Sequence, residues 1–383
     1  MQRLFLIFCL GLFFSCENSK ESKNPENGNI LENLTFSVDT VVIDAGEEII
    51  NLKNGVRLAS VNESKSHFYL FDDKGSQVQK IYLDKLAWEE NLPFEKEGPN
   101  GIGTGRHSKV IVYSEENFLF VSFPITGIFS KEGGLLKDLT IRYEDFKIEG
   151  QEEDESLNLT SQLTLADDQK TAFALPTNLL KGTRKLVKLD LEDSTGKILP
   201  IPALDIASEY HIIRQVDDMG MTIYTEPIHI QKFGSDVYLL TQSTNKIYQF
   251  DFHTDSVQLH EFDFTIVANQ KEIPVKNKVK TEEDFASQIE KAKSQINFEK
   301  LIYDEQSETF YRFGRKNIPQ ANKEVQKIQS FLFAFDKDLN LIGETELKGL
   351  ETLPESPFFK DGKLWSYVNV EDELGFAVFT FDF

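Results

Sequence analysis

One short motif recurs along this 383-residue chain and limits its fold more than any other feature. The motif is an apolar residue, any residue, an apolar residue and then Asp, and the spacings between successive copies are 58, 60, 61, 85 and 46 residues. A period in this range is typical of repeat proteins built from one supersecondary unit. The copies are YLFD, VKLD, YQFD, FAFD and FTFD, which end at Asp72, Asp190, Asp251, Asp336 and Asp382, and a degenerate copy, GIFS, which ends at Ser130.

Each copy has the sequence pattern of a β-hairpin. Phe331, Phe333 and Phe335 alternate with other residues, which places them on one face of a strand. Turn-forming residues follow, as in 193–196, and then another apolar segment. A further strand-like segment precedes the copy, for example 236–241. Three or four short antiparallel strands in each unit predict the blades of a β-propeller.

The N-terminal segment 35–44 completes this pattern. Its sequence, TFSVDTVVID, is that of a strand without a unit of its own, whereas the copy ending at Asp382 has no strand after it. Pairing the two would close the ring and remove two exposed strand edges. We therefore expect an all-β fold, a six-bladed β-propeller over residues 34–383 that is closed by its N-terminal strand. The alternative is an open array or a pair of β-sandwiches.

The longest spacing predicts one inserted helix, at about residues 281–298. Thr281 is a good N-cap before three acidic residues, and Phe285, Ile289, Ala292 and Ile296 follow at helical spacing. The helix would lie between the fourth and fifth blades. Because long insertions are often functional, Phe285 and Ile289 are candidates for contact with a partner, although a purely structural flap is equally compatible with the pattern.

Residues 1–16 resemble the signal peptide of a bacterial lipoprotein. Arg3 precedes an apolar run, Leu4 to Phe14, that is too short to span a bilayer, and Ser15-Cys16 resembles a lipobox. The resemblance implies lipid attachment at Cys16 and a membrane contact through this anchor. The polar segment 17–33 is expected to be a tether. The expected location is the cell envelope, at the outer membrane, either periplasmic or surface-exposed. An ordinary signal peptide cut elsewhere is the alternative.

Composition narrows the range of partners. The net charge of −22 argues against nucleic acid or anionic lipid as a direct partner. Because Cys9 and Cys16 are the only cysteines, the mature chain cannot form an internal disulfide. The six histidines show no metal-binding spacing, and no motif of a known catalytic class occurs. We therefore predict a monomer without a metal site or cofactor.

Two longer segments resemble a known family. They are FEKEGPNGIG at 94–103 and NFEKLIYDEQSETFYRFGR at 297–315. Together with the lipobox and the six units, they resemble the Bacteroidota lipoproteins of the domain-of-unknown-function 4221 family. The resemblance implies a six-bladed propeller on a membrane anchor. It implies no activity, so no catalytic residue can be carried over and the catalytic residues stay unknown.

A glycine-rich segment between the first two blades is the best candidate for a ligand or partner loop. Gly98, Pro99, Asn100 and Gly101 are followed by Gly103 and Gly105, and then by the basic residues Arg106 and His107. The same segment is also a strong turn signal, and a structural turn between blades is the competing interpretation.

These observations favour an envelope-anchored binding protein. A propeller presents loops on a rigid scaffold, and such loops suit a protein, peptide or glycan partner. The alternative is an envelope hydrolase or lyase with its active site in the axial channel, because a ring can gather distant residues without leaving a motif. Fold alone does not decide between binding and catalysis.

Overall fold

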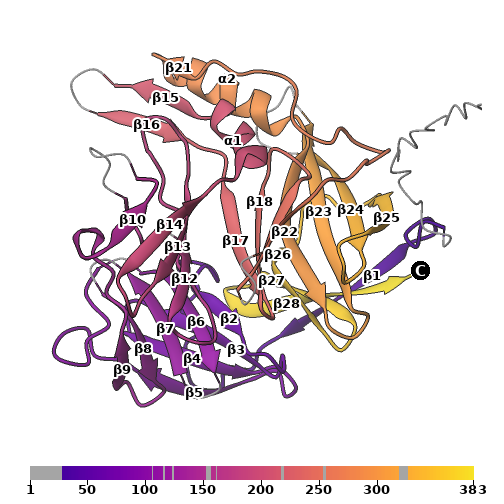
Figure 1. Cartoon of the computed structure of the whole chain (residues 1–383). Coiled ribbons are helices and arrows are strands. Elements are labelled where there is room, and N and C mark those ends of the chain that lie inside the picture. Colours follow the sequence, from indigo (N-terminus) through magenta and orange to yellow (C-terminus); the bar gives the residue numbers. More distant parts are fainter. Residues whose placement is uncertain are drawn as a thin grey trace, which may run out of the picture.

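The computed structural model describes residues 28–105, 107–114, 117–122, 125–151, 157–160, 162–216, 220–252, 256–318 and 327–383. The predicted signal peptide, Cys16 and residues 17–27 of the predicted tether lie outside these ranges. Within them, strands dominate and form seven sheets (Figure 1).

The first three sheets follow one another along the chain. The first has the order β2 (Ala59–Val61), β3 (His67–Asp72), β4 (Gln77–Tyr82) and β5 (Ala87–Pro93). The second has the order β6 (His107–Ser114), β7 (Asn117–Ser122), β8 (Thr126–Ser130) and β9 (Leu135–Asp138). The third has the order β11 (Thr164–Leu165), β12 (Thr171–Ala174), β13 (Leu186–Asp190), β14 (Thr195–Leu199) and β10 (Lys147–Glu149).

Three further four-stranded sheets complete this series. The fourth has the order β17 (Ile228–Phe233), β18 (Asp236–Thr241), β19 (Ile247–Asp251) and β20 (Val257–His260). The fifth has the order β22 (Asn297–Asp304), β23 (Thr309–Ile318), β24 (Lys327–Phe335) and β25 (Leu341–Glu346). The sixth has the order β26 (Glu355–Lys360), β27 (Lys363–Val370), β28 (Glu373–Asp382) and β1 (Thr35–Val42).

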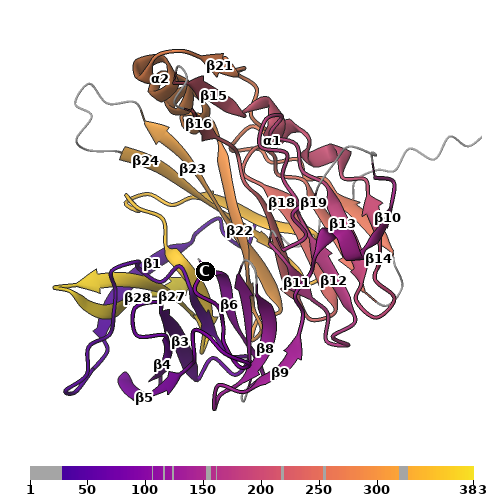
Figure 2. The same ribbon diagram turned by 90° about the vertical axis from the view of Figure 1, so that its left-hand side faces the viewer.

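Each of these sheets packs against the next through a core of its own. The ring centroids of Phe71 and Phe120 lie 5.3 Å apart between the first and second sheets, and those of Tyr238 and Phe310 lie 5.5 Å apart between the fourth and fifth. The sixth sheet packs on the first, where Phe68 meets Phe376 at 5.2 Å. Figure 2 shows the sheets following one another around a common centre. The protein is therefore all-β with a propeller-like organisation.

The sequence motif marks the third strand in all of these sheets except the first. Five copies lie on the third strand or extend one residue past its end, and these strands are β8, β13, β19, β24 and β28. The copy YLFD lies on β3, the second strand of its sheet. In the first sheet, the sequence pattern therefore identified the second strand in place of the third. The physical reason is that the motif describes a buried strand followed by a turn in which the Asp side chain accepts from a backbone N–H. Such a turn occurs in more than one hairpin of the same sheet. Asp72 accepts from the backbone N–H of Lys74 at 3.0 Å, just as Asp336 accepts from that of Asp338 at 3.0 Å.

The N-terminal strand pairs with the C-terminal strand, as predicted. β1 lies antiparallel to β28 over its whole length, from Thr35 opposite Asp382 to Val42 opposite Gly375 (Figure 1). The chain then crosses to the first sheet, where Asp44 forms a bridge with Ala87.

The end of the predicted tether is part of the folded structure. Leu31 is fully buried, and the Asn29 side chain donates to the backbone carbonyl of Glu344 at 2.8 Å and accepts from the backbone N–H of Glu344 at 3.0 Å. Residues 28–33 were assigned to the tether because their composition is polar. A single leucine flanked by hydrogen-bonding residues is nevertheless enough to hold them on the fifth sheet.

The inserted helix is confirmed between the fourth and fifth sheets. It is α2 (Glu282–Lys293), and the Thr281 hydroxyl caps it by accepting from the backbone N–H of Asp284 at 3.1 Å. It ends at Lys293 and not near 298, because Asn297 already begins β22.

A small satellite unit surrounds this helix, and its sheet was not predicted. It contains the seventh sheet, β16 (Met221–Tyr224), β15 (Ile212–Gln215) and β21 (Lys278–Val279), with α2 packed on it (Figure 1). The short helices η2 (Pro202–Leu204) and α1 (Ile206–Glu209) precede β15, and η1 (Tyr143–Asp145) lies before β10. The Glu226 carboxylate forms a buried ion pair with Lys271 at 2.7 Å and also accepts from the Tyr224 hydroxyl. The Lys271 N–H donates to the carbonyl of Ser243, between β18 and β19, at 2.9 Å, which ties the satellite to the fourth sheet.

Candidate functional site

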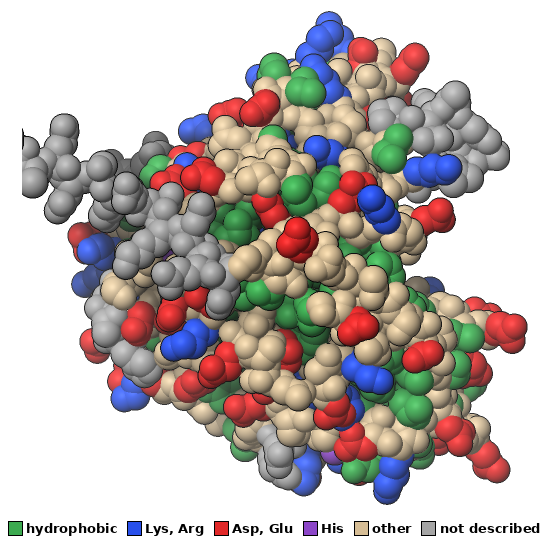
Figure 3. Space-filling model, turned by 90° about the vertical axis from the view of Figure 1, so that its right-hand side faces the viewer, with side chains coloured by type: hydrophobic (Ala, Val, Ile, Leu, Met, Phe, Trp, Pro, Cys, Tyr) green, Lys and Arg blue, Asp and Glu red, His purple; other side chains and the backbone are tan. Residues whose placement is uncertain are grey.

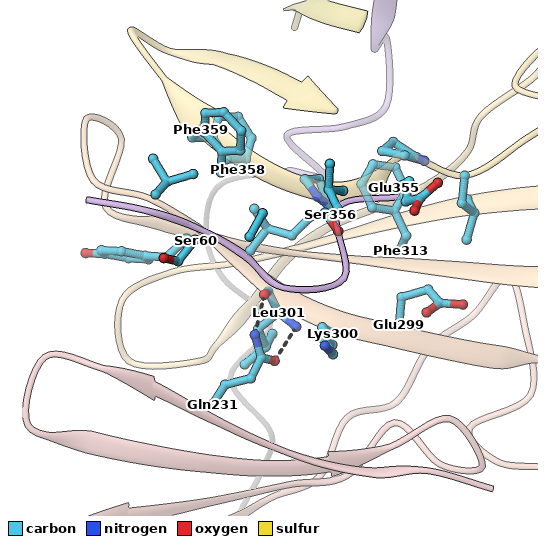
Figure 4. A pocket seen from close by; sticks show the side chains of 18 of the residues that line it. Ser60, Gln231, Glu299, Lys300, Leu301, Phe313, Glu355, Ser356, Phe358 and Phe359 are labelled. Atoms are coloured by element: carbon cyan, nitrogen blue, oxygen red, sulfur yellow. Dashed lines mark hydrogen bonds between the residues drawn. The ribbon is translucent and has the colours of Figure 1, made fainter. Parts of the chain in front are cut away.

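The first strands of several sheets border a cavity of about 720 Å³, which we call the central cavity. Residues from the first, fourth, fifth and sixth sheets line it, and Figure 4 shows how they converge. Its volume lies within the range of small-ligand pockets. Its lining includes the polar residues Ser60, Gln231, Glu299, Lys300 and Ser356 and the aliphatic residue Leu301.

A β-bulge in β22 shapes one wall of this cavity. The pairing of β22 with β23 shifts register between Phe298 and Leu301, so Glu299 and Lys300 lie in the bulge. The Gln231 side-chain amide compensates by donating to the carbonyl of Leu301 and accepting from its N–H, both at 2.9 Å (Figure 4). This pair of bonds joins the fourth sheet to the fifth and holds the bulge in place.

Most of the charged groups in the central cavity are paired. Glu299 lies 3.2 Å from Arg315, and Glu305 lies 3.0 Å from Lys65. Lys300 is exposed to the cavity, and among the described residues it has no carboxylate at ion-pair distance. The Glu355 side chain also has no ion-pair partner within the described part of the chain, and in Figure 4 it lies beside Phe313, away from Lys300.

Burial and the positive charge of Lys300 lower the pKa of two further basic residues on first strands, His229 and Lys109. His229 precedes Gln231 by two residues on β17; its pKa is lowered to about 3, mainly by burial and then by Lys300, Arg312 and Arg184. Lys109 on β6 donates to the Leu163 carbonyl and the Thr164 hydroxyl, both at 3.4 Å. Burial, followed by Lys300, lowers the pKa of Lys109 to about 8. The groups that shift these two pKa values include no carboxylate.

Arg312, on β23, is a structural tie between the fifth and fourth sheets. Its guanidinium is fully buried and donates to the carbonyls of Glu299 at 2.8 Å, Asn245 at 2.9 Å and Thr241 at 2.8 Å. Burial lowers the pKa of Arg312 to about 9. It holds Glu299, a residue of the central cavity, through the Glu299 carbonyl, and it is not itself among the lining residues.

The glycine-rich loop forms a tight turn whose backbone needs its glycines. Gly98 has a φ of +96°, and a Cβ at Gly101 would lie 2.8 Å from the backbone of Glu97. The Gly101 N–H donates to the Gly98 carbonyl at 3.1 Å, and the Asn100 side chain accepts from the Leu135 N–H at 3.1 Å. Pro99, at the tip of the turn, is exposed.

His107 and the end of this loop meet at a second cavity of about 660 Å³, between the first and second sheets. Gly103 and Gly105 line it together with Lys53, Lys74 and Lys96. His107 is buried between Phe71 and Phe120, with its ring nitrogens 3.3 Å from the Asp73 carboxylate and 3.2 Å from the Ile102 carbonyl. Arg106 lies outside the described residues. The structure thus separates the predicted loop from the central cavity.

The two candidate helix residues belong to the core of the satellite. Phe285 is buried against Ile212 and Val279, and Ile289 packs against the same cluster. Phe285 is therefore not available to a partner, whereas Ile289 is only partly buried. The hydrophobic face of an amphipathic helix is the face that a fold covers first.

Sequence reasoning missed the residues of the central cavity. Glu299, Lys300 and Arg315 all lie in the segment 297–315 that carries the family resemblance, so a signal was present. They lie on two neighbouring strands, β22 and β23, and the sequence does not show that they converge with Ser60 and Gln231, because that depends on the arrangement of the sheets. Among the described residues, no group of His, Cys, Asp or Glu is arranged to hold a metal ion. In the same residues, no helix is both long and apolar enough to cross a membrane.

These sheets and their cavity define a propeller-like all-β protein. The chain belongs to the family of the domain of unknown function DUF4221, whose family model matches residues 27–346. A crystal structure of a DUF4221 member from Bacteroides vulgatus is similar, with a TM-score of 0.64 and 13% identity over 91% of this chain and 98% of that one. This likeness and the family match confirm the family that the resemblance pointed to and a propeller-like all-β fold.

Two weaker likenesses are also found. The Bacteroides fragilis protein BF0058, which is named as an exported protein, has a TM-score of 0.49 and 11% identity over 93% of this chain and 97% of that one. The β-propeller domain of Cps50 from Myceliophteria thermophila has a TM-score of 0.40 and 10% identity over 84% of this chain and 82% of that one. A search of curated proteins found no match.

Proposed function

We propose that this chain is an envelope-anchored binding protein that takes a peptide or glycan segment of its partner into the central cavity. The six larger sheets are the blades of a closed propeller in this proposal, with β1 completing the sixth. The contacts of each sheet with the next, and of the sixth with the first, support the closure.

The observation that carries the proposal is the lining of the central cavity. Aromatic side chains such as Phe313 and Phe358 share it with polar groups from several sheets, such as Ser60 and Lys300. A mostly preformed cavity with a few convergent polar groups is the usual form of a ligand site. The ties made by Gln231 and Arg312 keep it rigid, which lowers the entropic cost of binding.

The proposed setting is the cell envelope. The lipobox-like sequence at Cys16 and the polar residues after it support a protein, which we expect to be a monomer, that is held at the membrane by lipid and otherwise exposed to the aqueous side. The central cavity would then face soluble or surface-bound partners.

The test is a binding screen that uses the full chain purified in detergent. An array of neutral and acidic oligosaccharides and short peptides is probed with the wild type, with Glu355→Trp and with Glu351→Trp. Glu355 is exposed and lines the cavity, so an indole there should fill the space, whereas Glu351 is exposed outside the cavity lining and serves as the matched control. We expect wild-type binding to be lost in Glu355→Trp and kept in Glu351→Trp.

Two results would overturn the proposal. Binding that is equal in all three proteins would place the site elsewhere. Release of products from an array member by the wild type, but not by Glu355→Trp, would favour the alternative of an envelope hydrolase or lyase acting in the same cavity.

A further inference from the structure

The cavity between the first and second sheets, which we call the loop cavity, has a lining rich in lysine. Its volume is about 660 Å³, and the proposed function does not use it. Three lysines from separate segments line it: Lys53 between β1 and β2, Lys74 between β3 and β4, and Lys96 after β5. The chain has a net charge of −22, and acidic side chains are scattered over the face in Figure 3. Three lysines around one cavity are therefore a local exception.

Carboxylates do not neutralise these lysines within the described part of the chain. All three side chains are exposed, and none of them has a carboxylate of a described residue at ion-pair distance. The Lys96 ammonium donates to the backbone carbonyl of Lys74 at 3.5 Å, which brings two of the three segments together. Glu95 and Glu97 lie on the same loop as Lys96, but they do not line the cavity.

The one carboxylate among the described lining residues belongs to Asp73, and His107 contacts it. The buried ring of His107 places one nitrogen 3.3 Å from the Asp73 carboxylate and the other 3.2 Å from the carbonyl of Ile102. Both partners are acceptors, so the two hydrogen bonds together need a hydrogen on each ring nitrogen, as in the imidazolium. The neighbouring Asp72 is buried outside the lining and accepts from the Asn51 side chain at 2.6 Å. The lining is therefore cationic.

The glycine-rich loop adds backbone donors to this lining. Gly103, Thr104 and Gly105 all border the loop cavity. The Gly103 N–H donates to the Lys96 carbonyl at 3.1 Å, whereas the N–H groups of Thr104 and Gly105 have no acceptor among the described residues. Backbone N–H groups beside cationic side chains stabilise a bound anion through charge-assisted hydrogen bonds.

We propose that the loop cavity binds an oxyanion, a carboxylate, sulfate or phosphate group, through Lys53, Lys74 and Lys96, with the N–H groups of Thr104 and Gly105 as further donors. A cavity of this volume admits a small molecule that carries such a group. The site goes beyond the proposed function, because the loop cavity and the central cavity share no described lining residue. It is also the segment that the sequence indicated as a ligand loop.

The experiment measures binding of defined small probes to the full chain by titration calorimetry in a non-ionic detergent. The probes are glucuronate, inorganic phosphate and the neutral sugar glucose. One double variant carries Lys74→Gln and Lys96→Gln, and its conservative counterpart carries arginine at the same two positions. The charge-matched control carries Lys276→Gln and Lys348→Gln, which remove two exposed lysines outside both cavities.

We expect the wild type to bind at least one of the two oxyanions more tightly than glucose, and to bind it more weakly as the salt concentration rises. The Lys74→Gln and Lys96→Gln variant should lose about tenfold or more in oxyanion affinity, the range of a charged hydrogen bond. The arginine variant should retain most of the affinity, and the charge-matched control all of it.

The outcomes separate this inference from the proposed function. Binding of glucuronate alone would identify a sugar acid as the ligand and binding of phosphate alone a free phosphate group, and either supports the site. No oxyanion binding by the wild type, equal binding by the wild type and the glutamine variant, or an equal loss in the charge-matched control overturns it. Oxyanion binding should be unchanged in Glu355→Trp, and its loss there would place the anion in the central cavity and also overturn the inference. Failure of the array screen leaves these expectations as they are.

Discussion

Individual side chains connect the sheets of this protein by bonding to backbone groups. The Gln231 side chain forms hydrogen bonds with the backbone N–H and C=O of Leu301 at the β22 bulge. The Arg312 guanidinium donates to the carbonyls of Thr241, at the end of β18, and Asn245, in the loop that follows. Buried backbone groups need such partners, so a long polar side chain that reaches across a boundary joins two sheets at a defined register. These ties lie next to the central cavity, whose geometry depends on them.

Arg312→Met tests one of these ties. The substitution keeps much of the volume but leaves at least three buried carbonyls without their donor, so we expect a loss of about 3 kcal/mol or more in the free energy of unfolding. Urea unfolding of the full chain measures it. Arg142→Met, at an exposed position, is the matched control and should change stability by less than about 0.5 kcal/mol. Similar stability of the two variants would show that Arg312 is not a tie.

His229 predicts a pH dependence whose sign follows from its pKa. The folded value of about 3 lies below the ordinary value of 6.5, so the unfolded chain binds a proton first as the pH falls. Stability should therefore decrease from about pH 6.5 towards pH 3, and this part of the loss should be absent in His229→Gln. Urea unfolding between pH 8 and pH 4 measures the difference between the two proteins. That difference should be constant above pH 7, and a constant difference down to pH 4 would refute the prediction.

At the scale of elements, β1 has the greatest consequence for the fold. It joins the two ends of the described chain by pairing with β28 and then leading Ile43 into the core between the sixth and first sheets. It is itself an edge strand with Val38 and Val42 partly exposed. Its contribution comes from covering the edge of β28 and not from burying a large surface of its own.

Deleting residues 35–44 should therefore destabilise the whole protein. We expect a loss of several kcal/mol, or aggregation, because the β28 edge becomes available for pairing with other chains. Deleting residues 17–27 is the control and should leave unfolding nearly unchanged, since these residues precede the first described contact at Asn29. Thermal unfolding and light scattering of both variants give the answer. Wild-type behaviour of the 35–44 deletion would argue against the proposed closure.

At the scale of the whole molecule, the acidic surface determines how much membrane attachment would depend on the proposed lipid anchor. Acidic side chains are dispersed and not gathered into one patch on the face in Figure 3. We expect the net charge of −22 to disfavour binding to anionic membranes or nucleic acid through charge. Attachment to a membrane would then depend on the lipid at Cys16 alone.

Cys16→Ser tests the anchor directly. The wild-type protein should partition with membranes and incorporate a fatty-acid probe, because Cys16 carries the proposed acceptor thiol. The variant should do neither. Membrane fractionation and probe labelling in cells measure both properties, and the central-cavity variant Glu355→Trp is the control that should remain labelled. Equal labelling of Cys16→Ser and wild type would exclude lipid attachment at this residue.

Local patterns were sufficient to predict most strands of the six larger sheets and the inserted helix, but not the satellite sheet. Alternation of apolar residues, turn residues and the Thr281 cap act within a few residues of one another, so their structural effect is visible in the sequence. The pairing of 35–42 with the last strand was also predictable, because one segment lacked a partner and one sheet lacked a strand. The same local character explains the wrong strand in the first sheet, since β3 and β4 both end in the same pattern.

The central cavity could be decided only by the tertiary structure. Ser60, Gln231 and Lys300 are far apart in sequence and come together because the first strands of different sheets meet at one centre. The sequence likewise did not reveal that Phe285 is buried. The sheet that covers α2 is built from short strands that precede the fourth sheet in the chain, β15 and β16, and one that follows it, β21. Periodicity reports which face of an element is apolar. Which other element covers that face, and which polar groups meet across a cavity, depends on contacts between residues that are distant along the chain.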